Sequence, residues 1–230
     1  MPRIILIETS TSQLSTALTD GDKVISYKEC AEPLRQASLT AVFVKEMLDD
    51  TGLSVKDCDA VCVSKGPGSY TGLRVGSSTA KGLCFGAGIP LIAVGTMELL
   101  VNQAIDAELL PQGCRYIIPM IDARRMEVYS AVFTADGRKL SGTSPVIVDA
   151  DSFRKELEEG VCLFIGDGAL KCKDTIASDN AVFVQCCPRA DAMLNPALEA
   201  YKEKRFENTA YFEPFYLKDF VATTSKKKLF

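Results

Sequence analysis

The sequence predicts an α/β protein of two duplicated domains, each with a mixed sheet and the element order βββαβαβα. Three observations indicate this fold class. The same order of strand-like and helix-like segments occurs over 3–107 and again over 115–204. In each copy an Asp-Gly turn, beginning at Asp20 or Asp136, joins two strand-like runs, as in a hairpin. In each copy a later buried strand leads into a glycine-rich corner.

Three strand-like runs open the first copy, and helices and strands then alternate. Short apolar runs between turn residues predict the strands. The first longer run begins after Pro33 and ends at Gly52, which predicts a helix between these two breakers. The expected elements are strands 3–10, 13–19 and 23–30, helix 34–50, strand 59–64, helix 73–87, strand 91–94 and helix 96–107.

The second copy repeats this order with shorter helices. Its expected elements are strands 115–121, 127–134 and 139–148, helix 151–159, strand 161–165, helix 171–177, strand 182–184 and helix 189–204. We therefore expect an N-terminal domain over 1–108, a C-terminal domain over 109–217 and a flexible basic tail over 218–230. Two such halves should meet at a cleft that faces the acidic strand ends and the glycine corners.

Composition narrows the possible functions. The 230 residues carry a net charge of −4, which argues against strong autonomous binding to nucleic acid. The chain has no histidine, so it lacks the commonest general base and metal ligand, and a Ser–His or Cys–His pair cannot form within it. Its nine cysteines contain no Cys-x-x-Cys pair, and no signal peptide or membrane span is apparent. We expect reduced thiols and a cytoplasmic location.

The most informative stretch is the corner 66–76, which leads from a buried strand into a helix. Gly66 and Gly68 permit a tight turn, and Thr71 is placed to cap the helix. Free backbone N–H groups at a helix N-terminus suit an anion, although such corners are more often plain turn chemistry. The corner is not a P-loop, because no Gly-Lys-Ser/Thr follows. Arg74 lies in the first helical turn, where the helix dipole disfavours a cation.

Two helices carry features of a partner surface. Small residues one turn apart on helix 73–87 predict the close approach of another helix. Apolar residues on helix 34–50 cover too wide an arc for one core-facing stripe, although full burial would explain them equally well. A core or turn role for Tyr70 also stays open. The candidate partner-binding residues are Leu39, Val42, Phe43, Tyr70, Gly72, Arg74, Gly76, Ala80 and Leu83. A large residue at Gly76 should then abolish partner binding and leave the fold intact.

Glu8 and Asp122 end the first strand of each copy. The two carboxylates can hold a magnesium ion through water. The alternative is that they are structural remnants, since a fold specifies function only weakly.

Several motifs together resemble the bacterial TsaB (YeaZ) family of tRNA threonylcarbamoyladenosine biosynthesis proteins. In order they are 5–10, the corner 66–76, 121–129, Gly166-Asp167-Gly168 and 214–218. The resemblance covers nearly the full length and implies two ribonuclease-H-like domains in an actin-like ATPase fold, in which helices 96–107 and 189–204 each cross between the halves. Two departures are mild. Glu8 replaces the family's usual aspartate, and Lys218 replaces an arginine, with loss of a bidentate donor.

The resemblance also implies a division of labour with the catalytic relative TsaD. The metal-binding His-Met-Glu-Gly-His of TsaD corresponds to the segment from Thr96 to Leu100, which has neither histidine. The chain thus resembles a non-catalytic scaffold that binds TsaD through helices 34–50 and 72–87 and supports threonylcarbamoyl transfer to the tRNA adenosine next to the anticodon. A TsaE ATPase would join the heterodimer, and tRNA would bind only through the complex.

Several points stay open. The chain alone needs no cofactor under this interpretation, whereas ATP, ADP or Mg²⁺ can belong to the interface of the complex. Without TsaD, homodimers would form through the same patch. The alternatives are a glycoprotease-like hydrolase, an ATP-dependent kinase of the actin-like superfamily, and a self-associating structural protein.

Overall fold

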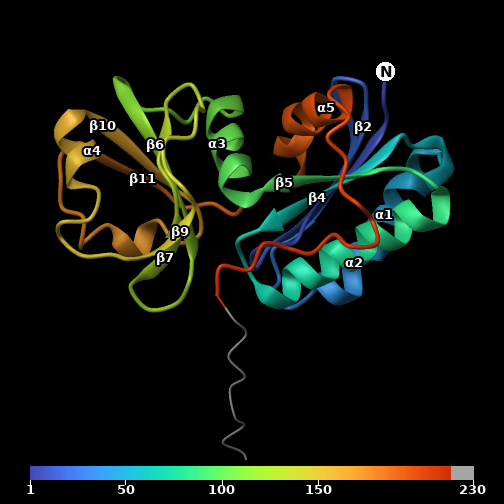
Figure 1. Ribbon diagram of the computed structural model, residues 1–230, viewed down its shortest axis with the longest axis horizontal. Coiled ribbons are helices and arrows are strands. Elements are labelled where there is room, and N and C mark those ends of the chain that lie inside the picture. The colour runs from blue at the N-terminus through green and yellow to red at the C-terminus, as the bar shows by residue number, and fades with distance from the viewer. Residues whose placement is uncertain (219–230) are drawn as a thin grey trace, which may run out of the picture.

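The computed structural model describes residues 1–218 and contains two α/β halves, each built on its own sheet (Figure 1). The second half follows the first in sequence and repeats its strand connections. The predicted fold class, a duplicated α/β protein with mixed sheets, is confirmed.

The first half is a five-stranded sheet in the order β3-β2-β1-β4-β5. The first three strands pair antiparallel, whereas β4 and β5 run parallel to β1 because helices connect them. The elements are β1 (Ile4–Glu8), β2 (Leu14–Asp20), β3 (Lys23–Cys30), α1 (Gln36–Thr51), β4 (Ala60–Gly66), α2 (Tyr70–Ala87), β5 (Leu91–Gly95) and α3 (Thr96–Asp106).

The second half has the equivalent order β9-β7-β6-β10-β11, and a short additional strand also pairs with β6. The duplication that was inferred from element order is therefore present in the strand pairing as well. The elements are β6 (Cys114–Asp122), β7 (Glu127–Ser130), β8 (Phe133–Thr134), β9 (Ser144–Ile147), α4 (Arg154–Glu159), β10 (Val161–Ile165), β11 (Ala181–Val184) and α5 (Leu194–Lys202).

Three expectations for the second half are wrong in detail. The strand expected over 127–134 is divided into β7 and β8, because the Val132 N–H donates to Ser141 Oγ instead of a neighbouring strand. The helix expected over 171–177 is only a 3₁₀ turn at Leu170–Cys172, a segment too short to sustain an α-helix. The helix expected over 189–204 begins as a 3₁₀ turn at Ala190–Met193 and becomes helical in α5.

Successive side chains of β1 enter two different cores. Ile5 and Ile7 lie in the core beneath α1 and α2, which pack side by side on one face of the sheet (Figure 1). Ile4 and Leu6 lie in the core on the other face, where α5 packs. Because both faces are covered, the strand is apolar throughout instead of alternating with polar residues.

Helices α3 and α5 each pack across the junction between the halves. Met97 and Leu100 of α3 belong to the core of the second sheet, together with Leu163. Ala197 and Leu198 of α5 belong to the core of the first sheet. The packing agrees with the expectation that both helices cross between halves. The division at residue 108 stays a prediction, since contacts of the packed helices extend across it.

The described part of the chain ends in an extended segment, residues 205–218, that we call the C-terminal strap. It leaves α5, passes the edge of β5 and continues along α2 towards the second half (Figure 1). Glu207 N–H donates to Leu91 O at 2.8 Å, and Phe212 is buried in the core beneath α2. Of the basic tail that was expected over 218–230, only Lys218 lies within the described residues.

Candidate functional site

The glycine corner packs tightly against the loop that follows β1. Ser69 N–H donates to Ser10 O at 2.6 Å. A Cβ on Gly68 would lie 2.2 Å from Ser10 O, so the backbone approaches too closely for any side chain. Helix α2 begins at Tyr70, and its N-cap is Ser69, whose Oγ accepts from the Gly72 N–H at 3.3 Å. The cap is therefore Ser69, and the expectation that Thr71 caps this helix is wrong.

The small residues of α2 face the interior of the same chain. A Cβ on Gly72 would lie 2.1 Å from Thr9 O, and one on Gly76 would lie 2.3 Å from Thr9 Oγ1. Ala80 is fully buried in the core. Contact with Thr9, which follows β1, is thus the reason for glycine at 72 and 76, and these positions do not offer a face for the close approach of another helix. The expectation that a large residue at Gly76 leaves the fold intact is also wrong.

The other candidate residues divide between the surface and its margins. Val42 and Arg74 are exposed, and the Arg74 guanidinium carbon lies 4.6 Å from the centre of the Tyr70 ring. Half-buried positions are Tyr70, Leu83, Leu39 and Phe43. The last two lie on the flank of α1 that carries Glu46 and Asp50 at helical spacing. Both acids pair with Lys28 of β3, so this flank partly faces the chain itself.

An exposed stripe runs along the outer side of α2, and most of it was not predicted. We call Thr71, Arg74, Ser78, Gly82 and Phe85 the outer stripe. Phe85 is 88% exposed, and a Cβ on Gly82 would meet nothing within 4 Å. The signal in the sequence was a phenylalanine out of phase with the buried positions of α2, which are 72, 73, 76, 77, 80 and 84.

A cleft of about 590 Å³ lies where the two halves meet. Its walls come from the loop after β1, the glycine corner, the end of β6 and the strap. Lining residues include Ser10, Gly68, Tyr70, Asp122, Arg124, Asp167, Tyr216 and Lys218. The prediction that strand ends and glycine corners face a common cleft is therefore confirmed for most of these segments.

Glu8 is the exception, because it is fully buried and does not line the cleft. Its Oε1 accepts from the Ser10 N–H, while Oε2 is buried and has no hydrogen-bond partner within residues 1–218. Burial raises the pKa of Glu8 from 4.5 to about 7. A carboxyl in this environment is neutral or half-ionised at physiological pH.

Glu8 and Asp122 do not share the wall of the cleft as a magnesium site would require, because Asp122 lines the cleft and Glu8 does not. The Asp122 carboxylate is paired with Lys171, and its Oδ1 also accepts from the Arg124 N–H at 2.8 Å. Asp167 lines the cleft together with Asp122, and burial raises the pKa of Asp167 to about 6. Within residues 1–218, no three acidic or cysteine side chains form a group that can hold a metal ion. The residues present do not fit the cation expected there.

Comparisons with known proteins identify the family. The family model described as "TsaD: tRNA N6-adenosine threonylcarbamoyltransferase" matches residues 35–161, more than half of the chain. The tRNA threonylcarbamoyladenosine biosynthesis protein TsaB of Bacillus subtilis (strain 168) is 31% identical over 167 residues, which are 71% of this chain and 70% of that protein. The chain belongs to the TsaB family.

Further TsaB relatives match over greater lengths. The TsaB protein of Escherichia coli (strain K12) is 28% identical over 231 residues, and the alignment covers 96% of both chains. The solved structure of YeaZ from Pseudomonas aeruginosa superposes with a TM-score of 0.82 at 22% identity, covering 94% of this chain and 100% of that one. This likeness shows that the two proteins share a fold.

The start of α3 is the segment that the TsaB family resemblance aligned with a metal-binding motif of TsaD. Thr96 and Leu100, which the family resemblance aligned with two histidines of TsaD, are both fully buried. Thr96 Oγ1 has no hydrogen-bond partner among the described residues. These positions are now part of the packed junction between the halves.

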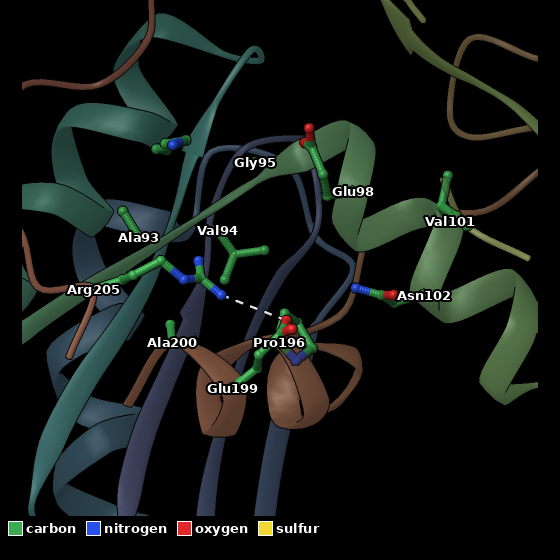
Figure 2. Close-up of a pocket in the computed structure, with 12 residues that line it drawn as sticks. Ala93, Val94, Gly95, Glu98, Val101, Asn102, Pro196, Glu199, Ala200 and Arg205 are labelled. Atoms are coloured by element: carbon green, nitrogen blue, oxygen red, sulfur yellow. Dashed lines mark ion pairs between the residues drawn. The ribbon is translucent and has the colours of Figure 1, made fainter. Parts of the chain in front are cut away.

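A second pocket, of about 350 Å³, lies between α3, β5 and α5 (Figure 2). Arg205 and Asn102 point into it from opposite walls (Figure 2). Arg205 pairs with Glu199 at 3.5 Å, and Glu98 pairs with Lys139 at 2.8 Å. The pocket is also lined by Lys65. Over residues 1–218, no helix combines the length and hydrophobicity needed to cross a membrane.

Proposed function

We propose that the chain is a non-catalytic subunit that binds a TsaD partner through the outer faces of α1 and α2 and supports threonylcarbamoyl transfer to tRNA. The proposal rests on TsaB family membership, since curated relatives are named as tRNA threonylcarbamoyladenosine biosynthesis proteins. A TsaE ATPase and tRNA would engage the heterodimer. The net charge of −4 gives the chain alone little affinity for tRNA.

The observation that carries the proposal is the exposed outer stripe of α2, together with exposed Val42 on the neighbouring helix α1. Phe85 and Val42 are 88% and 43% exposed, which leaves apolar surface in water. Gly82 lies in the helix interior without any contact that requires glycine, at a cost of about 1 kcal/mol relative to alanine. A glycine on an open face lets the backbone of another helix approach closely.

The kind of partner follows from the match to the TsaD family model. The matched residues 35–161 include all of α1 and α2, so a TsaD chain is expected to carry an equivalent helix pair. Two related helix pairs can pack face to face in an approximately two-fold arrangement. The same surface would support a homodimer when TsaD is absent.

A bulky charged residue on the outer stripe tests this interface. Gly82→Lys should leave the melting temperature within a few degrees of wild type, because a Cβ there meets nothing within 4 Å. The lysine should block the approach of a TsaD helix, so the affinity for TsaD should fall at least about tenfold. A mixture of the variant with TsaD and TsaE should also modify less tRNA than the wild-type mixture.

Gly142→Lys is the matched control, because Gly142 lies in an exposed loop of the second half and also has nothing within 4 Å of a Cβ. It should bind TsaD like wild type. Undiminished capture by Gly82→Lys would refute the proposed interface, and modification without any TsaD would refute the non-catalytic role.

A further inference from the structure

The C-terminal strap has two parts that do different things. The part up to Phe212 stabilises the first half, because it covers the edge of its sheet. Glu207 pairs with the edge strand β5, and Lys81 Nζ of α2 donates to Ala210 O at 3.2 Å and to Phe212 O at 3.1 Å. This part covers an exposed sheet edge and buries one aromatic ring, which is sufficient for a structural role.

Beyond Phe212 the strap continues to the glycine corner. Phe215 N–H donates to Lys65 O at 2.7 Å, and a Cβ on Gly66 would lie 2.7 Å from Phe215 O. Gly66 also has a φ of +105°, which favours glycine. The corner therefore has the backbone conformation and the free space that the passing strap requires. Lys218 then pairs with Glu127 of β7 in the second half.

Tyr216 is the point at which the strap reaches the start of α2. Its ring centre lies 4.7 Å from that of Tyr70, and the planes are tilted by 38°. Arg74 lies over the same Tyr70 ring at 4.6 Å. Three side chains from the strap and the first turns of α2 thus form one contiguous cluster, Arg74–Tyr70–Tyr216.

Arg74 is left available for another molecule. It is exposed, and within residues 1–218 no carboxylate lies within 4.0 Å of its guanidinium group. Its position in the outer stripe places it on the face assigned to the partner. Arg74 is the fifth residue of α2, so it lies in the second helical turn and not in the first turn, where it was expected. Its contact with the Tyr70 ring leaves guanidinium N–H groups that can donate to an external acid.

We propose that Tyr216 is a positioning residue. It holds the Tyr70 ring, and Tyr70 in turn orients the Arg74 guanidinium towards an acidic side chain of the bound TsaD partner. This inference rests on the proposed function of α1 and α2. It assigns the last residues of the strap, 213–218, to recognition, in contrast to the structural part before them.

Tyr216→Ala tests the inference, with Tyr211→Ala as the matched control. Both are tyrosines of the strap, but Tyr211 is 84% exposed. Tyr216→Ala should weaken TsaD binding about tenfold and speed amide hydrogen exchange over 70–76 in the chain alone. Tyr216→Phe should restore both, since the ring is retained. Tyr211→Ala should change neither, and all three variants should unfold cooperatively.

The Arg74 step has its own test. If Tyr216 acts through Arg74, Tyr216→Ala should add less than about twofold to the binding loss of Arg74→Ala. Fully additive losses would overturn the inference, as would equal binding by Tyr216→Ala and Tyr211→Ala. If Gly82→Lys abolishes capture while Tyr216→Ala does not, the inference alone is wrong. If neither variant affects capture, the α1–α2 interface itself is wrong.

Discussion

Gly72→Ala is expected to destabilise the protein by about 3 kcal/mol, although alanine is a better helix former than glycine. The added Cβ would lie 2.1 Å from Thr9 O, a backbone atom that cannot rotate away. To remove this clash, α2 or the loop after β1 must move. The same loop accepts a hydrogen bond from the Ser69 N–H and lines the cleft. Urea denaturation followed by circular dichroism would measure the loss.

Gly82→Ala is the control on the same helix. A Cβ there meets nothing within 4 Å, so the substitution should stabilise the chain by up to about 1 kcal/mol through helix propensity alone. Changes of opposite sign in the free energy of unfolding at Gly72 and Gly82 would separate the effect of packing from that of helix propensity. Similar effects at both sites would contradict the contact between α2 and Thr9.

Glu8→Gln is expected to flatten the pH dependence of stability. The folded state holds the Glu8 pKa at about 7, above 4.5, so it binds more protons than the unfolded state between these values. The stability from neutral Glu8 is fully present below pH 4.5 and is lost as pH rises through about 7. The shift corresponds to roughly 3 kcal/mol, and glutamine retains the shape without titrating.

The measurement is the free energy of unfolding of both proteins between pH 4.5 and 8.5. The difference between Glu8→Gln and wild type should grow in favour of the variant as pH rises. Asp167 titrates in the same direction with a pKa of about 6, but it is present in both proteins and largely cancels in the difference. Parallel profiles would show that Glu8 does not titrate in this range.

Much of the fold could be predicted because the signals are local. The strand expected over 23–30 is observed as Lys23–Cys30, and the one expected over 161–165 as Val161–Ile165. Asp-Gly turns and uninterrupted apolar runs depend on neighbouring residues, so they can be recognised without knowledge of the fold. Repetition of their order then predicted the duplication.

Parts of the candidate site could not be predicted, because they depend on contacts between distant segments. Nothing local distinguishes Gly72 and Gly76, which meet Thr9, from Gly82, which meets nothing. The roles of Glu8 and Asp122 looked alike, yet one is buried and the other is paired with Lys171. The strap was recognised only as a family motif near its end.

The sequence by itself determined the order of the elements, the duplication of that order and the family, because each depends on local residue patterns. Only the tertiary structure decided which side of α2 is inside the protein and which side is exposed. Helical spacing defines the faces of a helix, but the neighbour on each face is set by packing between segments far apart in the chain.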